Sequence, residues 1–155
     1  MTLNRELIEV SIEIDADPQR VWSIVSDLRR MGERSPQCRK MIILGTPVGV
    51  GTKTININRA GWLHWPTTSK VIEFDPGRRL AFRVPQNRSV WTYDVQARGH
   101  GTLLTESRRL PHGASAASNF LTGRLFGGTA RFEDQLERGM GRTLAQIKAE
   151  AESQA

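Results

Sequence analysis

Residues 49–111 decide the fold of this chain and read GVGTKTININRAGWLHWPTTSKVIEFDPGRRLAFRVPQNRSVWTYDVQARGHGTLLTESRRLP. Four tight-turn signals divide this stretch, at residues 49–51, 75–77, 85–87 and 99–101. The segments between them are rich in β-branched and aromatic residues, which is typical of strands, and short connections favour an antiparallel meander. The predicted strands are Thr52–Arg59, Thr67–Phe74, Arg79–Val84, Ser89–Ala97 and Thr102–Leu110.

The residues before this stretch add another strand at the start and two short helical segments. Apolar and polar residues alternate near the N-terminus, as in a half-buried strand. Asp17 is a good N-cap residue, and Pro18 suits the first helical position, where its missing N–H costs nothing. The predicted elements are a strand over Glu6–Ile14, a helix over Pro18–Leu28, a helical turn over Arg29–Arg34 and a strand over Arg39–Leu44.

A long amphipathic helix is predicted over Thr129–Glu152. Its apolar residues recur every three or four positions and form one stripe: Phe132, Leu136, Met140, Leu144 and Ile147. Charged residues, Glu133 among them, are expected off this stripe. Strands in series followed by one long helix define an α+β fold in which a curved sheet grips a helix. The segment Ser118–Phe126, followed by two glycines, is interpreted as a gate over the space between them.

Composition places the chain among ordinary globular proteins. The hydrophobic fraction of 38% and the charged fraction of 25% suit one domain spanning residues 1–155. No apolar run approaches the ~20 residues that span a bilayer, and the N-terminus lacks the apolar segment of a signal peptide. The single cysteine excludes an internal disulfide. These features together predict a cytoplasmic protein.

The net charge of +6 raises the question of a nucleic-acid partner. The arginines are scattered along the chain without a basic helix or dense cluster, so no nucleic acid is expected, and the charge steers anionic ligands only weakly. The three histidines and the single cysteine offer no metal-ligand spacing. No glycine pattern precedes a helix as in dinucleotide or phosphate-binding loops. No metal and no cofactor are therefore predicted.

Several motifs, in this order and spacing, resemble a known family. They are VWSIVSD at 21–27, MGERSPQC at 31–38, GT at 51–52, NRAG at 58–61, Trp65 with TT at 67–68, Phe82 with Val84, WTY at 91–93 and GTLLTES at 101–107. The chain resembles the START-like (SRPBCC) superfamily, in its bacterial polyketide cyclase/dehydrase-like branch. The resemblance covers Ile8 to Ile147 and implies a helix-grip fold with a deep hydrophobic cavity between the sheet and the C-terminal helix.

The chain departs from that family at one segment. Related sequences tend to carry Trp and Glu where this chain has Arg34 and Gln37. The first change removes an apolar wall, and the second removes a possible acid or base. Relatives include lipid carriers, hormone receptors and aromatic cyclases, so the resemblance implies a pocket and leaves its chemistry open.

Polar candidates for this pocket lie on the last two predicted strands. If Tyr93 faces the concave side, the next strand places Glu106 and Arg108 on the same face, as a carboxylate beside a guanidinium. Tyr93 and Glu106 are then the candidate catalytic groups; the alternatives are a structural ion pair near the rim, or side chains directed to solvent. The predicted ligand-binding residues are Asn58, Trp65, Phe82, Trp91, Tyr93, Leu104, Glu106, Arg108, Phe132, Leu136 and Met140.

Three other residues invite a functional interpretation that the pattern does not favour. His64 is predicted in a hairpin loop, either guarding the pocket mouth or covering apolar surface. Cys38 has no visible histidine partner, so a small buried residue is favoured over a nucleophile. Asn58 either lines the cavity or caps a hairpin.

Three functions remain open from the sequence. The leading hypothesis is binding or carriage of a hydrophobic or aromatic small molecule, such as a lipid or polyketide, by a monomer or homodimer. The second is a cyclase or dehydratase of aromatic polyketides that uses Tyr93 and Glu106. The third is an interaction protein whose pocket is vestigial.

Overall fold

A computed structural model describes residues 6–30, 38–45, 47–86, 88–111 and 129–153. Seven antiparallel strands form one sheet in the order β1-β7-β6-β5-β4-β3-β2, so β2 to β7 make a meander and β1 pairs with β7. The strands are β1 (Leu7–Ile14), β2 (Cys38–Leu44), β3 (Lys53–Ala60), β4 (Leu63–Asp75), β5 (Arg79–Val84), β6 (Ser89–Arg98) and β7 (Gly101–Arg109). The helical segments are α1 (Pro18–Val25), η1 (Leu28–Arg30) and α4 (Thr129–Glu152).

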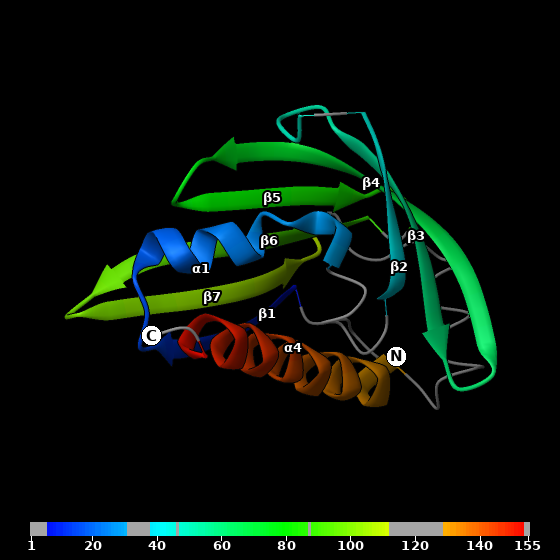
Figure 1. The fold of residues 1–155 in the computed structure, drawn as a ribbon. Coiled ribbons are helices and arrows are strands. Elements are labelled where there is room, and N and C mark those ends of the chain that lie inside the picture. Colours follow the sequence, from blue (N-terminus) through cyan, green and yellow to red (C-terminus); the bar gives the residue numbers. More distant parts are fainter. Residues whose placement is uncertain (1–5, 31–37, 46, 87, 112–128, 154–155) are drawn as a thin grey trace.

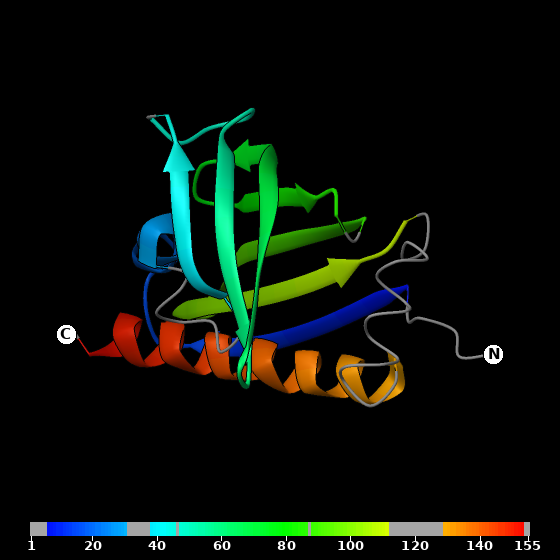
Figure 2. The ribbon, with the colours of Figure 1, turned by 90° about the vertical axis from the view of Figure 1, so that its right-hand side faces the viewer.

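The sheet curves, and both α-helices lie on its concave side (Figures 1 and 2). Helix α4 packs against β1, β7 and α1, while α1 also contacts β6 and β7. The concave side is called the inner face below, and the convex side the outer face. This arrangement confirms the predicted α+β helix-grip fold.

Helix α1 begins where the sequence indicates. The Asp17 side chain accepts a hydrogen bond of 2.8 Å from the Gln19 N–H, and Pro18 occupies the first turn. The helix ends at Val25, three residues before the predicted Leu28, because η1 begins there as a separate 3₁₀ turn. The predicted helical turn over Arg29–Arg34 is described only as far as Arg30.

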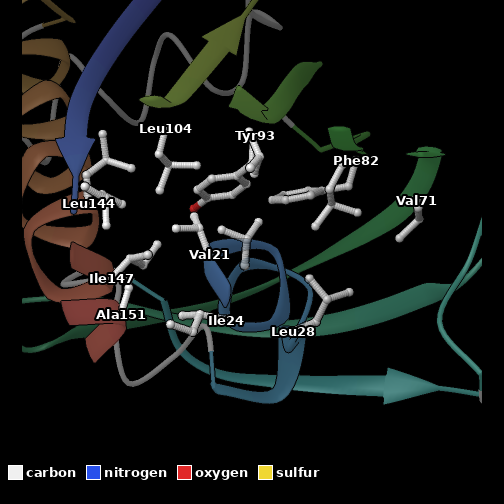
Figure 3. Packing of buried hydrophobic residues seen from close by; sticks show 14 of the residues in the cluster. Val21, Ile24, Leu28, Val71, Phe82, Tyr93, Leu104, Leu144, Ile147 and Ala151 are labelled. Carbon is white, nitrogen blue, oxygen red and sulfur yellow. The ribbon is translucent and has the colours of Figure 1, made fainter. Parts of the chain in front are cut away.

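The main apolar core lies where α1, β5–β7 and the C-terminal half of α4 meet (Figure 3). The ring of Tyr93 lies between side chains of α1 and the sheet, close to Val21. Helix α4 supplies Leu144, Ile147 and Ala151 to this cluster, all fully buried. In the first half of α4, by contrast, Phe132 and Leu136 are only half-buried. Among the described residues, the second half of α4 is thus more deeply buried than the first half.

Strand β4 is longer than predicted and corrects one expectation. It begins at Leu63, four residues before the predicted Thr67, so His64 is part of a strand and not of a hairpin loop. The β3–β4 turn consists of Gly61 and Trp62 alone, because Ala60 and Leu63 already pair. Gly61 has φ +61°, which a glycine at the first position of a two-residue hairpin turn adopts without strain.

Two further expectations fall on residues that the structure does not describe. The gate over Ser118–Phe126 and the departures at Arg34 and Gln37 both lie outside the described residues. Within the described ranges, no helix is both long and apolar enough to cross a bilayer.

Candidate functional site

The inner faces of β6 and β7 bring the predicted polar residues together. The register pairs Trp91 with Arg108, and Tyr93 with Glu106. Gly101 allows the start of β7 to lie close to the end of β1: a Cβ there would lie 2.4 Å from the Ile14 carbonyl oxygen, closer than real Cβ atoms approach. The tight β6–β7 turn and the two-residue period of the strands therefore place Tyr93 beside Glu106.

Tyr93 and Glu106 form a buried hydrogen-bonded pair. The Tyr93 hydroxyl donates to Glu106 Oε2 over 3.0 Å, and Glu106 is only 3% exposed. Cross-strand neighbours are apolar, with Val10 opposite Glu106 and Leu80 opposite Tyr93. Within the described part of the chain, Glu106 Oε1 is buried and has no hydrogen-bond partner. The pair therefore retains one unused polar atom in apolar surroundings.

Burial controls the protonation of this carboxyl group. Desolvation raises the pKa of Glu106 to about 8, and the hydrogen bond from Tyr93 opposes this by favouring the charged form. Below that pH the carboxyl group is mainly neutral, with one O–H donor and remaining acceptor capacity. It is thus able to exchange hydrogen bonds with a carbonyl or hydroxyl group of a ligand.

Arg108 has a different partner from the one that the strand pattern suggests. Its Nη2 donates to Glu133 Oε2 of α4 over 2.7 Å, and both side chains are buried. The guanidinium charge is therefore balanced by the helix and not by Glu106. This is the structural ion pair considered as an alternative, except that its partner is Glu133. The pair links β7 to α4.

Glu133 is a residue that sequence reasoning missed, because it was assigned to the polar side of the helix. The spacing of Glu133 from the apolar residues of the helix could have indicated that it faces inward. Glu133, Leu136 and Met140 lie three and four residues apart, so they share one face of α4. Met140 is buried. A lone acid on such an apolar face indicates a buried ion pair, although only the fold identifies the cation.

The other predicted ligand-binding residues fall into two groups, those within or against the main core and those that are only half-buried. Phe82 and Leu104 belong to the main core, and Trp91 packs against it while donating its indole N–H to Ser89 Oγ over 3.0 Å. Trp65 is half-buried, as are Phe132 and Leu136 of α4. The half-buried aromatic and aliphatic side chains retain surface that a hydrophobic ligand can cover.

A second polar group on the inner face joins β3 to β4, and sequence reasoning recognised only Asn58 in it. The Thr54 hydroxyl donates to Asn56 Oδ1 over 2.8 Å and also hydrogen-bonds Ser69. The Thr67 hydroxyl accepts from Asn58 Nδ2 over 2.9 Å and from Asn56 Nδ2 over 3.4 Å. We call Thr54, Asn56, Asn58, Thr67 and Ser69 the β3–β4 polar cluster. Its signal was the alternation of polar residues at every second position of β3.

Asn58 itself serves the hairpin and the inner face together. Besides Thr67, its Nδ2 contacts the Trp65 carbonyl oxygen at 3.3 Å across the β3–β4 ladder. The amide therefore ties the two strands together near their turn, while remaining only partly buried.

Cys38 lies opposite Asn58 in the β2–β3 pairing, and His64 lies on β4. Cys38 is half-buried against the core, and burial raises the pKa of its thiol, which disfavours the reactive thiolate. His64 is exposed. Among the residues that the structure describes, no three His, Cys, Asp or Glu side chains lie together as metal ligands would.

Comparison with known proteins identifies the family. Residues 5–152 match the model of a family described as polyketide cyclase/dehydrase and lipid transport, so the chain belongs to that family. No protein with a curated description matches the chain.

Solved structures agree with the fold. The aromatase/cyclase ZhuI from Streptomyces sp. R1128 is 20% identical with a TM-score of 0.74, the match covering 94% of this chain and 93% of that one. The polyketide cyclase-like protein Cgl2372 from Corynebacterium glutamicum is 28% identical with a TM-score of 0.60, covering 96% and 94%. The di-domain aromatase/cyclase StfQ of steffimycin biosynthesis is 13% identical with a TM-score of 0.77, covering 96% of this chain but only 51% of StfQ. This chain thus spans about half the length of the di-domain proteins.

Proposed function

We propose that the chain binds a hydrophobic or aromatic small molecule between the inner face of the sheet and the first half of α4. The observation that carries this proposal is the unpartnered Glu106 Oε1, buried beside Tyr93 among apolar side chains. A buried polar atom without a partner costs about 1–3 kcal/mol. A ligand that hydrogen-bonds to this atom recovers that cost, so the site favours an apolar ligand with a carbonyl or hydroxyl group.

The half-buried side chains of Trp65, Trp91, Phe132 and Leu136, which come from β4, β6 and α4, supply apolar surface for such a ligand. Aromatic and aliphatic walls with a few oriented polar groups are typical of small-molecule sites. Family membership supports the same class of ligand, because the family description names polyketide chemistry and lipid transport.

The experiment uses 9-fluorenone and fluorene, two tricyclic probes that differ by one carbonyl oxygen. Calorimetric titration of the chain measures both affinities at neutral pH, where Glu106 is mainly protonated. We expect fluorenone to bind roughly fivefold more tightly, the value of one net hydrogen bond. Glu106→Leu is expected to remove this preference while fluorene still binds. The matched control is Glu9→Leu, which removes an exposed carboxylate from the outer side of β1.

Each outcome is informative. Equal affinity of both probes for the unmodified chain contradicts the role of Glu106. If Glu9→Leu also removes the preference for fluorenone, the preference does not arise from Glu106. If neither probe binds at all, the ligand-binding proposal fails, and the interaction protein with a vestigial pocket becomes the better hypothesis.

A cyclase or dehydratase is the second candidate, and the raised pKa of Glu106 favours it. A carboxyl group with a pKa of about 8 can give or take a proton near neutral pH, as general acid–base catalysis requires. Intramolecular aldol cyclisation moves a proton from a carbon to the attacked carbonyl oxygen, and dehydration then releases water. Tyr93 would orient the carboxyl group through Oε2.

Turnover separates catalysis from binding. A synthetic oligo-β-ketone thioester incubated with the chain should yield a cyclised product by mass spectrometry, and Glu106→Gln should lower the rate about 100-fold or more while affinity changes little. A product rate no higher than that without protein would exclude the catalytic candidate for this substrate class and leave the binding function standing.

A further inference from the structure

The outer side of β2, β3 and β4 has an unusual charge distribution. From Cys38 to Ile72 the sequence contains no Asp or Glu, although it contains five Lys or Arg residues. Neither α-helix covers this side, since both lie on the inner face (Figures 1 and 2). The basic residues of this region therefore lack local acidic neighbours in sequence.

Three cations stand directly opposite one another across neighbouring strands. Lys53 of β3 pairs with Lys70 of β4, which in turn pairs with Arg83 of β5. All three are exposed on the outer face, and none forms an ion pair with any residue in the described ranges. Like charges directly opposite in a sheet destabilise it, so this cationic row (Lys53, Lys70 and Arg83) is better explained by an anionic partner than by folding.

Large apolar side chains are exposed beside the row. Leu44 pairs with Lys53 at the edge of the sheet and is 49% exposed, and Ile42 on the same face of β2 is 39% exposed. Trp62, which is 85% exposed, lies at the tip of the β3–β4 hairpin, at the other end of β3 from Lys53, and is not part of this surface. The exposed aliphatic groups next to the cationic row form a surface that is both basic and apolar.

We propose that this outer patch, comprising the cationic row with Ile42 and Leu44, docks the protein on an anionic lipid surface. Basic residues attract anionic headgroups, while exposed aliphatic side chains enter the boundary between headgroups and acyl chains. A nucleic acid would meet the cations but would leave the aliphatic side chains against a polar backbone. An acidic protein surface would satisfy the charge, but it would also need an apolar surface shaped to fit Ile42 and Leu44. The lipid interface satisfies both properties.

Vesicle flotation tests the proposal with the full chain. Vesicles of phosphatidylcholine alone are compared with vesicles in which phosphatidylglycerol replaces a quarter of the lipid, at low and high salt. Replacing each cation is expected to weaken binding about fivefold, so Lys53→Gln, Lys70→Gln and Arg83→Gln together should weaken it on the order of 100-fold. The control removes the same charge from exposed positions of α4: Arg131→Gln, Arg138→Gln and Arg142→Gln.

Support requires salt-sensitive binding to the anionic vesicles, lost in the row variant and retained in the α4 control. Leu44→Gln should also weaken this binding, because it removes an exposed aliphatic side chain beside Lys53 that would enter the lipid interface. Equal loss in both triple variants means that net charge and not the patch drives binding, which overturns the proposal. Absence of vesicle binding overturns it too, and gel-shift binding of duplex DNA in its place would assign the row to nucleic acid. None of these results depends on the ligand of the inner face.

Discussion

The protonation of Glu106 makes the stability of the fold depend on pH in a defined direction. The ordinary pKa of 4.5 applies to the unfolded chain, whereas burial raises the pKa in the folded chain to about 8. Below pH 4.5 both states carry the proton, and stability is at its full value. Between the two values the unfolded chain releases a proton that the folded chain keeps, so stability falls as pH rises and levels off above about pH 8.

The size of the effect follows from the same two values. One pH unit over which the two states differ by one proton changes the free energy of unfolding by about 1.36 kcal/mol. From pH 4.5 to about 8 the change for Glu106 accumulates to roughly 5 kcal/mol at most. For a chain of this length, with a urea dependence of about 1–3 kcal/mol per molar, the unfolding midpoint moves by roughly 2–5 M at most.

The assay is urea unfolding of the unmodified chain and of Glu106→Gln across this pH range. Glutamine keeps the shape of the side chain but cannot ionise, so the difference between the two proteins isolates Glu106 from every other titrating group. We expect the unmodified chain to lose stability relative to the variant as pH rises. A difference that stays flat from about pH 5 to about pH 9 would refute the reasoning, because the carboxyl group would then titrate alike in both states.

Three other predictions concern the interactions around this site. Arg108→Met or Glu133→Leu alone should cost about 3–5 kcal/mol in urea unfolding, because each leaves a buried charge unpaired; the double variant should recover most of this, and additive losses would contradict the coupling. Tyr93→Phe should raise the pKa of Glu106 further, since it removes the hydrogen bond that favours the carboxylate; NMR titration of the carboxyl carbon measures the direction, and a lowered pKa would count against it. Asp17→Ala should lower thermal stability by about 1 kcal/mol through loss of the α1 N-cap, and an unchanged melting temperature would contradict that role.

Local sequence signals predicted most of the sheet because strand and turn patterns act over a few residues. The strand over Arg79–Val84 has the predicted bounds, and apart from the start of β4 the ends of the other strands differ from the prediction by at most one residue. The β4 start was missed because it depends on how short a turn the chain adopts. A turn of only Gly61 and Trp62 extends the pairing to Leu63, and no periodicity within β4 reports this.

The candidate site was predictable only as far as strand periodicity reaches. Tyr93 and Glu106 were expected on one face because residues at every second position share a face and the β6–β7 turn is tight. The partner of Arg108 depends on where α4 lies against β7, which is a contact between residues distant in sequence. The apolar stripe on α4 correctly predicted that Met140 is buried. It did not predict that Glu133 forms an ion pair with Arg108.

The two polar regions of the inner face differ in how completely their polar atoms are hydrogen-bonded. In the β3–β4 polar cluster, the hydroxyl of Thr54 and the amides of Asn56 and Asn58 all have partners within the cluster, so it stabilises the pairing of its own strands. Glu106 accepts from Tyr93 through one oxygen and retains the other without a described partner. Since buried polar atoms are nearly always satisfied, an unsatisfied one needs a reason beyond folding. The family's fold provides the sheet and the helix, and in the described part of this chain we propose that Glu106 Oε1, the carboxyl oxygen that Tyr93 does not contact, is where a ligand is recognised.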